Sequence, residues 1–374
     1  MASTTRASGL VVAMLPYFCD HFGNPHTQDH ERGWNAHEAI ESARGHIAKL
    51  VGAQARDVIF TSGATEANNI ILQGAAHFRR QHDARRHLVT LVSEHSAVLQ
   101  VCKALEKQGF CVDIINVGHD GIVDLQALAS VLRSDTAIVS AMLVNNEIGV
   151  IQPLGEIATL CQDHDIWLHS DAAQAAARIP ISITGMAVQF LSLSGHKIYG
   201  PMGIGAAIAA KGYLQKLTPM VFGGGQEMAI RPGTVPLALA VGFGKAASLC
   251  ADEMAQDTAH VRQCTEIFLD ILKSKIDMVR INGCQKRRAP GNLHLTLLGT
   301  DHDVFFGHLQ GIALSAGSAC MGAGVRSHVL EAIGIDAREA GANFRIGFGR
   351  DNTIQDAKDA AELIVAAWKD CKEF

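Results

Sequence analysis

The most restrictive feature of the sequence is an alternation of short apolar runs with longer amphipathic segments, which begins near residue 58. The apolar runs have the length of strands, and the segments between them have a helical period. Repeated strand–helix units with crossover helices favour an α/β fold with a parallel, doubly wound sheet. Strands are expected at 58–60, 87–92, 112–117, 137–144, 166–169, 190–193 and 203–209, with helices ending near 77 and covering 96–108, 125–132 and 156–164.

Polar side chains follow the C-terminal ends of four of these predicted strands. They are His95, Asn146, Asp171 and Lys197. In open α/β sheets, ligands bind at the edge where the strands end. Four polar residues after four strands are stronger evidence than any one of them, so the sequence predicts a binding site at this edge.

Lys197 lies in the stretch Ser194–Lys197, between the end of an apolar strand and the chain-breaking pair Gly200-Pro201. A lysine held on a short loop after a strand suits covalent amine chemistry, because desolvation readily shifts the pKa of an ammonium group. Taken alone, the stretch favours a turn that carries a solvated surface lysine. The choice depends on what the rest of the chain supplies.

The turn Thr61–Glu66 connects the first strand to a helix and contains Gly63. A strand, a glycine turn and a helix start direct free backbone N–H groups and the positive end of the helix dipole toward an anion, usually a phosphate. An ordinary N-cap at Ser62 is an alternative of about equal merit.

Composition excludes several classes of function. Charged residues are 18% of the chain, apolar residues are 48%, and the formal net charge is −5, so we expect a soluble protein with no membrane contact and no direct nucleic acid binding. The nine cysteines include no C-x-x-C pair, which argues against disulfides and structural zinc and favours a reducing cytoplasm. His26 and His30 lack a His-Glu-x-x-His context, so no metal site is predicted.

Two basic clusters, Arg79–Arg86 and Lys286–Arg288, are expected to be solvated charges of loops or helix ends. A patch that docks a partner is the less favoured alternative.

At 374 residues the chain is long enough for two domains. We expect a large domain at 8–250 and a smaller α+β domain at 251–374, which also takes in residues 1–7. Further helices are expected at 7–18, 34–51, 237–249, 251–273 and from 354 onward, and further strands at 292–297, 312–315 and 343–347.

The polar residues fit one cofactor in particular. Pyridoxal phosphate needs a lysine for its aldehyde, an acid for its pyridine nitrogen, a ring against its face and donors for its phosphate. The chain offers Lys197, Asp171, His95 and the turn at Thr61–Thr65. No G-x-G-x-x-G after a strand and no Walker lysine competes with this interpretation.

Seven short motifs stand out along the chain, at Thr61–Glu66, Glu94-His95, Val144–Glu147, Asp171–Gln174, Ser194–Lys197, Arg231–Thr234 and Gly317–Cys320. In order and spacing they resemble those of a known family, the cysteine desulfurases, over nearly the whole chain. The resemblance implies the pyridoxal-phosphate fold-type I of class V aminotransferases, with a mostly parallel seven-stranded sheet and a smaller α+β C-terminal domain. It also implies conversion of L-cysteine to L-alanine, with the sulfur left as a persulfide on a loop cysteine.

The resemblance also implies roles for the cofactor site. Lys197 would bind the aldehyde, Asp171 would pair with the pyridine nitrogen, Gln174 would hydrogen-bond the ring hydroxyl, and His95 would stack on the ring and move protons. The residues implied to hold the phosphate are Ala64, Thr65, Ser194 and His196.

Further implied roles concern the substrate and the assembly. Asn146 and Arg345 would bind the substrate carboxylate, a task that suits a bidentate guanidinium. Thr234 would reach the phosphate of a neighbouring subunit, which implies a homodimer with shared active sites.

Cys320 carries the sulfur chemistry in this interpretation. It lies in a run of small residues, Ala316–Gly322, as suits a thiolate that takes sulfur from a substrate and delivers it. The Gly-Ser-Ala-Cys form resembles the long-loop group of the family, which passes sulfur to acceptor proteins.

Some features depart from the family pattern. Only Ser3–Thr5 remains of the usual N-terminal motif, and Met321 begins a run that replaces a Thr-Ser-rich one. Another enzyme of the same fold, such as selenocysteine lyase, and a non-catalytic scaffold are the alternatives. The pathway is left open between iron–sulfur assembly, tRNA thiolation and DNA phosphorothioation.

Overall fold

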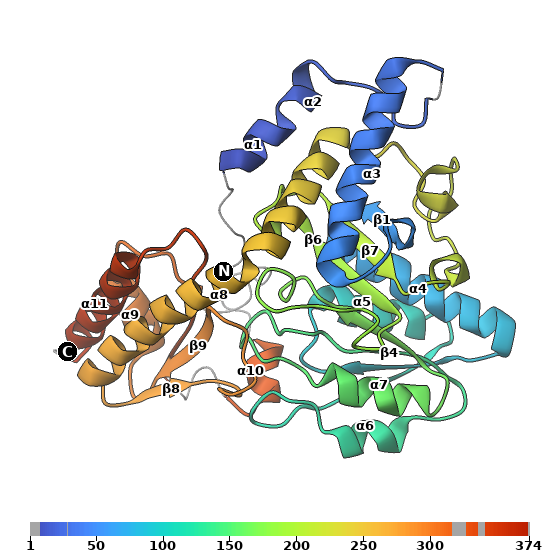
Figure 1. The fold of residues 1–374 in the computed structure, drawn as a ribbon. Coiled ribbons are helices and arrows are strands. Elements are labelled where there is room, and N and C mark those ends of the chain that lie inside the picture. Colours follow the sequence, from blue (N-terminus) through green and yellow to red (C-terminus); the bar gives the residue numbers. More distant parts are fainter. Residues whose placement is uncertain (1–7, 28, 316–326, 336–340, 373–374) are drawn as a thin grey trace.

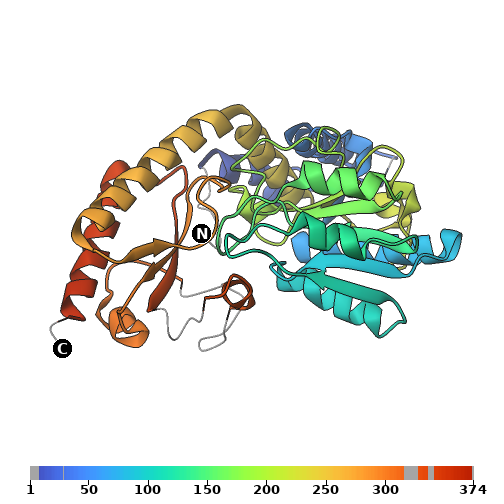
Figure 2. The same cartoon turned by 90° about the horizontal axis from the view of Figure 1, so that it is seen from below.

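The structure, a computed structural model, describes residues 8–27, 29–315, 327–335 and 341–372. It has a larger part built around a seven-stranded sheet and a smaller part built around a three-stranded sheet. One long helix runs from the first part to the second (Figure 1, Figure 2). This architecture confirms the predicted α/β fold with a smaller α+β part.

The large sheet has the strand order β1-β7-β6-β5-β4-β2-β3. Adjacent strands are parallel from β6 to β3, whereas β7 is antiparallel to both of its neighbours. The parallel prediction is therefore confirmed for all but this strand. The strands are β1 (Val58–Thr61), β2 (His87–Leu91), β3 (Cys111–Ile115), β4 (Thr136–Ser140), β5 (Trp167–Asp171), β6 (Phe190–Ser194) and β7 (Gly205–Ala209).

Helices cover both faces of this sheet and enclose two apolar cores. Successive strand residues point to opposite faces, so Phe190 packs in one core while Leu191 and Leu193 pack in the other. On one side lie α3 (Glu31–Val51), α6 (Leu125–Val131), α7 (Leu154–Gln162) and the first half of α8 (Leu237–Lys275), and on the other lie α4 (Ala64–Asp83) and α5 (Ser96–Glu106).

The smaller part has its own core between its sheet and the helices that pack on it. Its strands are antiparallel in the order β10-β9-β8. A separate apolar cluster joins α10, which follows residue 326, to the larger part. The elements are β8 (Val279–Ile281), β9 (Asn292–Leu297), α9 (His302–His308), α10 (His328–Ala332), β10 (Ala342–Gly347) and α11 (Ile354–Asp370).

The helix α8 belongs to both parts. Its side chains up to Met254 pack in the core of the large sheet, and those from Val261 onward pack in the smaller core. We propose that the division between the domains lies between these two residues, close to the predicted boundary at 250/251. Neither α8 nor any other helix in the described part of the chain is both long and apolar enough to cross a bilayer.

Several elements differ from the prediction. The helices expected at 237–249 and 251–273 are one continuous helix, because no residue near 250 breaks it. The helix expected at 7–18 is divided into α1 (Ser8–Met14) and α2 (Pro16–Cys19), where proline begins a new helix. Residues 312–315 form no strand, and only Ser315 makes an isolated bridge, to Arg345.

The prediction that the two basic clusters are solvated is wrong for several of their members. Arg79 is only 3% exposed, pairs with Asp165 at 3.1 Å and lies over the Trp167 ring. Arg288 donates hydrogen bonds to four backbone carbonyls, on residues 148, 282, 283 and 292. These guanidinium groups hold loops together because buried carbonyls need donors.

A buried ion pair connects segments far apart in the sequence. Both terminal nitrogens of Arg44 on α3 donate to the Glu227 carboxylate, at 2.9 and 2.7 Å. The same carboxylate accepts the backbone N–H of Phe60 at 2.7 Å. Glu227 and its next two residues have φ values of 46°, 58° and 58°, which such residues rarely adopt. The ion pair therefore holds a strained turn against β1.

We expect Glu227→Ala to lower the free energy of unfolding by about 3–5 kcal/mol, because Arg44 would remain buried without its partner. Glu41→Ala is the matched control. Its carboxylate also contacts Arg44, at 3.0 Å, but is 43% exposed, so its loss should change stability by less than about 1 kcal/mol. Urea denaturation followed by circular dichroism measures both. Equal effects of the two substitutions would contradict this interpretation.

Candidate active site

A cavity of about 360 Å³ lies where the strands β6, β5, β4 and β2 end. The structure brings most of the predicted site residues to its wall. Thr234 is exposed and is not one of the residues that line the cavity, and Cys320 lies outside the described residues. The predicted residues that line the cavity are Ala64, Thr65, His95, Asn146, Asp171, Gln174, Ser194, His196, Lys197 and Arg345.

Asp171 is the last residue of β5 and is 6% exposed. Its Oδ1 accepts the backbone N–H of Ala173 at 3.0 Å, and its Oδ2 accepts the side-chain amide of Asn68 at 2.8 Å. Two donors on two sides fix the orientation of the carboxylate. Asn68 was missed in the sequence, although it lies one helical turn after Ala64 on the same face of α4.

Glu94 is a second buried carboxyl group near Asp171. It is fully buried, and burial, followed by the charge of Asp171, raises its pKa well above the usual value. Its Oε1 accepts the backbone N–H of Met142 at 2.5 Å. The raised pKa disfavours ionisation of Glu94, and of these two carboxyl groups only that of Asp171 lines the cavity.

His95 is the N-cap residue of α5 and lines the same cavity. Its Nδ1 accepts the backbone N–H of Ala97 at 3.1 Å, so the neutral ring carries its proton on Nε2. This bond caps the helix and fixes the plane of the imidazole. The ring is therefore held in one orientation at the wall of the cavity.

The turn before α4 is arranged as an anion cradle. Gly63 is the N-cap residue, and no side chain caps the helix, so Ser62 is not the N-cap of the alternative interpretation. The backbone N–H of Ser62 instead bonds to Glu66, whose other oxygen pairs with Arg231 at 3.0 Å. The first N–H groups of this 20-residue helix, at Ala64 and Thr65, therefore have no side-chain acceptor from the turn.

Strand β7 passes close behind this turn. A Cβ added at Gly205 would lie 2.6 Å from the Cα of Gly63, which only a glycine avoids. Beside this turn, the Oγ of Ser194 and the Nδ1 of His196 are joined by a hydrogen bond of 3.0 Å. Burial, together with the charge of Lys197, lowers the pKa of His196 and favours its neutral form.

Lys197 ends the short helix η2 (Gly195–Lys197), which directly follows β6. The turn is closed by two hydrogen bonds to the Gly195 carbonyl, from the N–H groups of Ile198 and Gly200. A Cβ at Gly195 would lie 2.9 Å from the carbonyl oxygen of Pro201, so the turn needs glycine there. The lysine side chain extends into the cavity from a rigid base.

Arg345 on β10 brings the smaller part into the site. It is 4% exposed, and its Nη1 donates to the backbone carbonyl of Asn146 at 2.7 Å. The loop of Asn146 is held by the neighbouring Asn145, whose Oδ1 accepts the N–H groups of Glu147 and Ile148 at 2.9 Å each. Both predicted carboxylate ligands therefore meet on one wall. Sequence reasoning missed Met142, Met202 and Gly203, which also line the cavity.

The donor set fits pyridoxal phosphate. The cavity has an oriented carboxylate, an N–H cradle for a phosphate, and a lysine in the short helix that follows β6, the strand next to β5. The buried Oδ1 of Asn68 has no hydrogen-bond partner among the described residues, as expected next to a polar ligand.

Comparisons with known proteins agree with this geometry. A family model, aminotransferase class-V, matches residues 1–359. Cysteine desulfurase IscS of Rickettsia bellii (strain OSU 85-389) is 43% identical over 364 residues, which are 97% of this chain and 88% of that protein.

Solved structures give the same result. A NifS-like protein superposes with a TM-score of 0.89 at 29% identity, covering 98% of this chain and 96% of its own. SspA in complex with cysteine superposes with a TM-score of 0.83 at 34% identity, covering 93% of this chain and 97% of its own. The chain therefore belongs to the class-V aminotransferases and, within them, to the cysteine desulfurases, which use pyridoxal 5'-phosphate.

Proposed function

We propose that this protein converts L-cysteine to L-alanine, holds the sulfur as a persulfide on Cys320 and passes it to an acceptor protein in the cytoplasm. The observation that carries the proposal is the single cavity in which Lys197, Asp171 and Arg345 meet. Amine chemistry, an electron-withdrawing ring and carboxylate recognition require these three residue types together. The reducing compartment agrees with the eight described cysteines, which are all free.

Different residues of the cavity are assigned to different parts of the cofactor. Bound pyridoxal phosphate supplies an aldehyde for an amine and a ring that withdraws electrons from bonds at the substrate Cα. Lys197 would bind that aldehyde, and Asp171, with its Oδ2 held by Asn68, would hold the pyridine nitrogen. His95 would cover the ring and move protons through Nε2. Gln174 would reach the ring hydroxyl, and the phosphate would be held by Ala64, Thr65, Ser194 and His196.

Substrate orientation comes from the opposite wall. Arg345 binds the α-carboxylate through its guanidinium, and its bond to the Asn146 carbonyl keeps it turned toward the cavity. The side chain of Asn146 adds a donor to the same carboxylate. A substrate held in this way would present its α-amino group to Lys197.

The sulfur step needs a second thiol. The thiolate of Cys320 attacks the substrate sulfur, an S–S bond forms, and the C–S bond breaks with its electron pair left on the substrate Cβ. A proton is then added at that carbon, which yields L-alanine. Atoms and electrons balance without an external oxidant or reductant.

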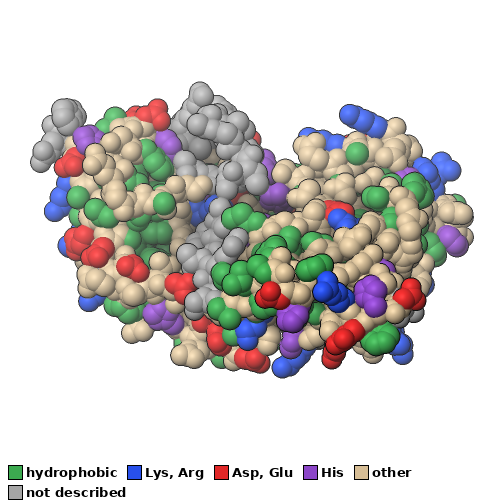
Figure 3. Space-filling model, turned by 90° about the horizontal axis from the view of Figure 1, so that it is seen from above, with side chains coloured by type: hydrophobic (Ala, Val, Ile, Leu, Met, Phe, Trp, Pro, Cys, Tyr) green, Lys and Arg blue, Asp and Glu red, His purple; other side chains and the backbone are tan. Residues whose placement is uncertain are grey.

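The assembly we propose is a homodimer with shared active sites. Thr234 is exposed and does not line the cavity of its own chain, so its hydroxyl is available for the phosphate of a partner. The N-terminal helices expose large apolar side chains, with Val12 71%, Leu15 57% and Phe18 61% exposed. Figure 3 looks onto this end of the molecule and shows apolar side chains at the surface. Burying such side chains against a second copy favours association.

Cys320→Ser tests the sulfur step. We expect L-alanine formation to fall by about two orders of magnitude or more, because serine cannot take the sulfur. Intact-mass analysis after one turnover should show one added sulfur on the wild type and none on the variant. Cys111→Ser, at an exposed cysteine on the edge strand β3, is the control and should retain both. Unchanged alanine and persulfide in Cys320→Ser would refute the proposal and favour a lyase of the same fold.

Asn68→Ala tests the cofactor assignment. The variant removes the donor to Asp171, so we expect the Kd for pyridoxal phosphate to rise by about tenfold, as for a lost bond to a charged group. Asn69→Ala, at the adjacent and partly exposed residue, should leave the Kd nearly unchanged. Titration of the apoprotein followed by absorbance gives both values. Equal Kd values for the two variants would contradict the assignment of Asp171.

Two heterodimers test the sharing of sites. In the first, one subunit carries Thr234→Ala and the other carries Lys197→Ala, so one site keeps both residues. In the second, one subunit carries both substitutions and its partner is wild type, so the site that retains lysine faces Ala at 234. We expect the lysine-containing site to bind pyridoxal phosphate about tenfold more weakly in the second heterodimer. Equal affinities, or a monomer in sedimentation, would contradict shared sites.

A further inference from the structure

Tyr199, two residues after Lys197, has an unusual backbone and a buried side chain. Its φ of 67° is in the left-handed region, which bulky residues rarely adopt, and the side chain is only 7% exposed. The turn that begins at Gly195 fixes this conformation, because the N–H of Gly200 bonds to the Gly195 carbonyl at 2.9 Å. A strained residue beside a site lysine needs a compensating contact, and that contact comes from the smaller part.

Arg350 supplies the contact in two ways. Its backbone N–H donates to the Tyr199 hydroxyl at 3.1 Å, and its guanidinium carbon lies 4.3 Å from the centre of the tyrosine ring. The guanidinium is held in that place by carboxylates of α8, at 2.8 Å from Glu253 and 2.5 Å from Asp257. Burial raises the pKa of Tyr199, so the hydroxyl stays neutral and accepts the N–H with a lone pair.

On the side of the smaller part, Arg350 is close in sequence to Arg345, the residue proposed to bind the substrate carboxylate. Arg350 follows Arg345 by five residues, and β10 covers the stretch up to Gly347. The connecting residue Phe348 is buried, and its N–H donates to the Gly291 carbonyl at 2.8 Å. The two arginines therefore lie at the ends of one short segment, which is held by the pairing of β10 and by the bond to Gly291.

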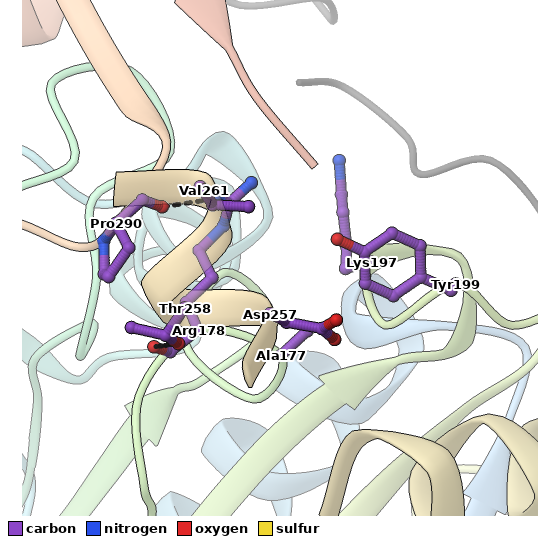
Figure 4. Close-up of a pocket in the computed structure, with 8 residues that line it drawn as sticks. All are labelled: Ala177, Arg178, Lys197, Tyr199, Asp257, Thr258, Val261 and Pro290. Carbon is purple, nitrogen blue, oxygen red and sulfur yellow. Dashed lines mark hydrogen bonds between the residues drawn. The ribbon is translucent and has the colours of Figure 1, made fainter. Parts of the chain in front are cut away.

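Figure 4 shows the surroundings of this contact, with Tyr199 beside Lys197 and the carboxylate of Asp257 directed toward the tyrosine. On the facing wall, Arg178 of the larger part donates to the carbonyl of Pro290 at 2.5 Å (Figure 4). The hydroxyl of Thr258 on α8 donates to the Arg178 carbonyl at 3.2 Å. Two contacts near α8 thus connect the two parts, the Arg178–Pro290 hydrogen bond and the Tyr199–Arg350 contact. Of these two, the Tyr199–Arg350 contact involves the turn that carries Lys197.

We propose that the Tyr199–Arg350 contact is a positioning clamp that sets the separation of Lys197 and Arg345, and with it the recognition of α-amino acids by their amino and carboxylate groups together. The inference rests on the proposed function, because it takes Lys197 and Arg345 as the residues at the two ends of the substrate. Tyr199 and Arg350 touch neither substrate nor cofactor in this proposal and act through the residues they hold.

The test is Tyr199→Phe, which keeps the ring under the guanidinium and removes only the hydroxyl acceptor. We expect KM for L-cysteine to rise by about three- to tenfold, the effect of one lost hydrogen bond, with a smaller change in kcat. The inhibition constant of L-alanine, which has the same two groups and no thiol, should rise by a similar factor. Tyr213→Phe is the matched control, because this tyrosine packs on Trp167 in a core away from the cavity.

A second measurement does not depend on turnover. Hydrogen exchange in the apoprotein should show faster exchange of the Arg350 amide and of residues 342–348 in Tyr199→Phe than in Tyr213→Phe. Faster exchange together with a raised KM supports the clamp. Faster exchange in a protein that does not use L-cysteine would contradict the proposed function while leaving the contact itself in place. Unchanged exchange, or an unchanged KM in an active enzyme, would overturn the clamp.

Discussion

Parallel strands bring their carboxyl ends to one edge of a sheet, and the site depends on this constraint more than on any single contact. Four residues lie at or after the C-terminal ends of β2, β4, β5 and β6, which are neighbours in the sheet: His95, Asn146, Asp171 and Lys197. Their spacing is therefore set by the distance between hydrogen-bonded strands, and helices on both faces keep that distance rigid. Short local devices then orient each side chain, such as the cap at His95 and the glycine turn before Lys197.

The large sheet alone supplies only part of the site. Arg345 comes from the smaller part, which is held in place by the continuous helix α8 and by contacts at the Asn146 carbonyl and at Tyr199. In the proposed function, a substrate with an amino group and a carboxylate would meet Lys197 from the larger part and Arg345 from the smaller part. We infer that the ion pairs of Arg350 with Glu253 and Asp257 on α8 serve this division, since a small shift between the parts would separate Lys197 from Arg345.

The sequence was sufficient for the sheet, its edge and the residues at the ends of its strands, because periodicity and chain breakers are local properties. It was insufficient for residues whose role depends on what packs against them. Asn68 and Glu94 are such residues, since each acquires its role from Asp171, far away in sequence. The prediction that the basic clusters are solvated was wrong for Arg79 and Arg288, because the backbone carbonyls that these side chains contact are brought close only by folding. The short strand β8 lacks an apolar run, and α8 lacks a breaker where two helices were expected.

The central claim is that Lys197 is the one lysine that holds pyridoxal phosphate at the edge of the sheet. Reduction of the loaded protein with borohydride fixes the cofactor to the amine that binds it, and mass spectrometry of the peptides then locates the label. The account predicts one label per chain, on the peptide that contains Lys197. A label on another lysine, such as Lys211 or Lys245, or a protein that takes up no label, would contradict it.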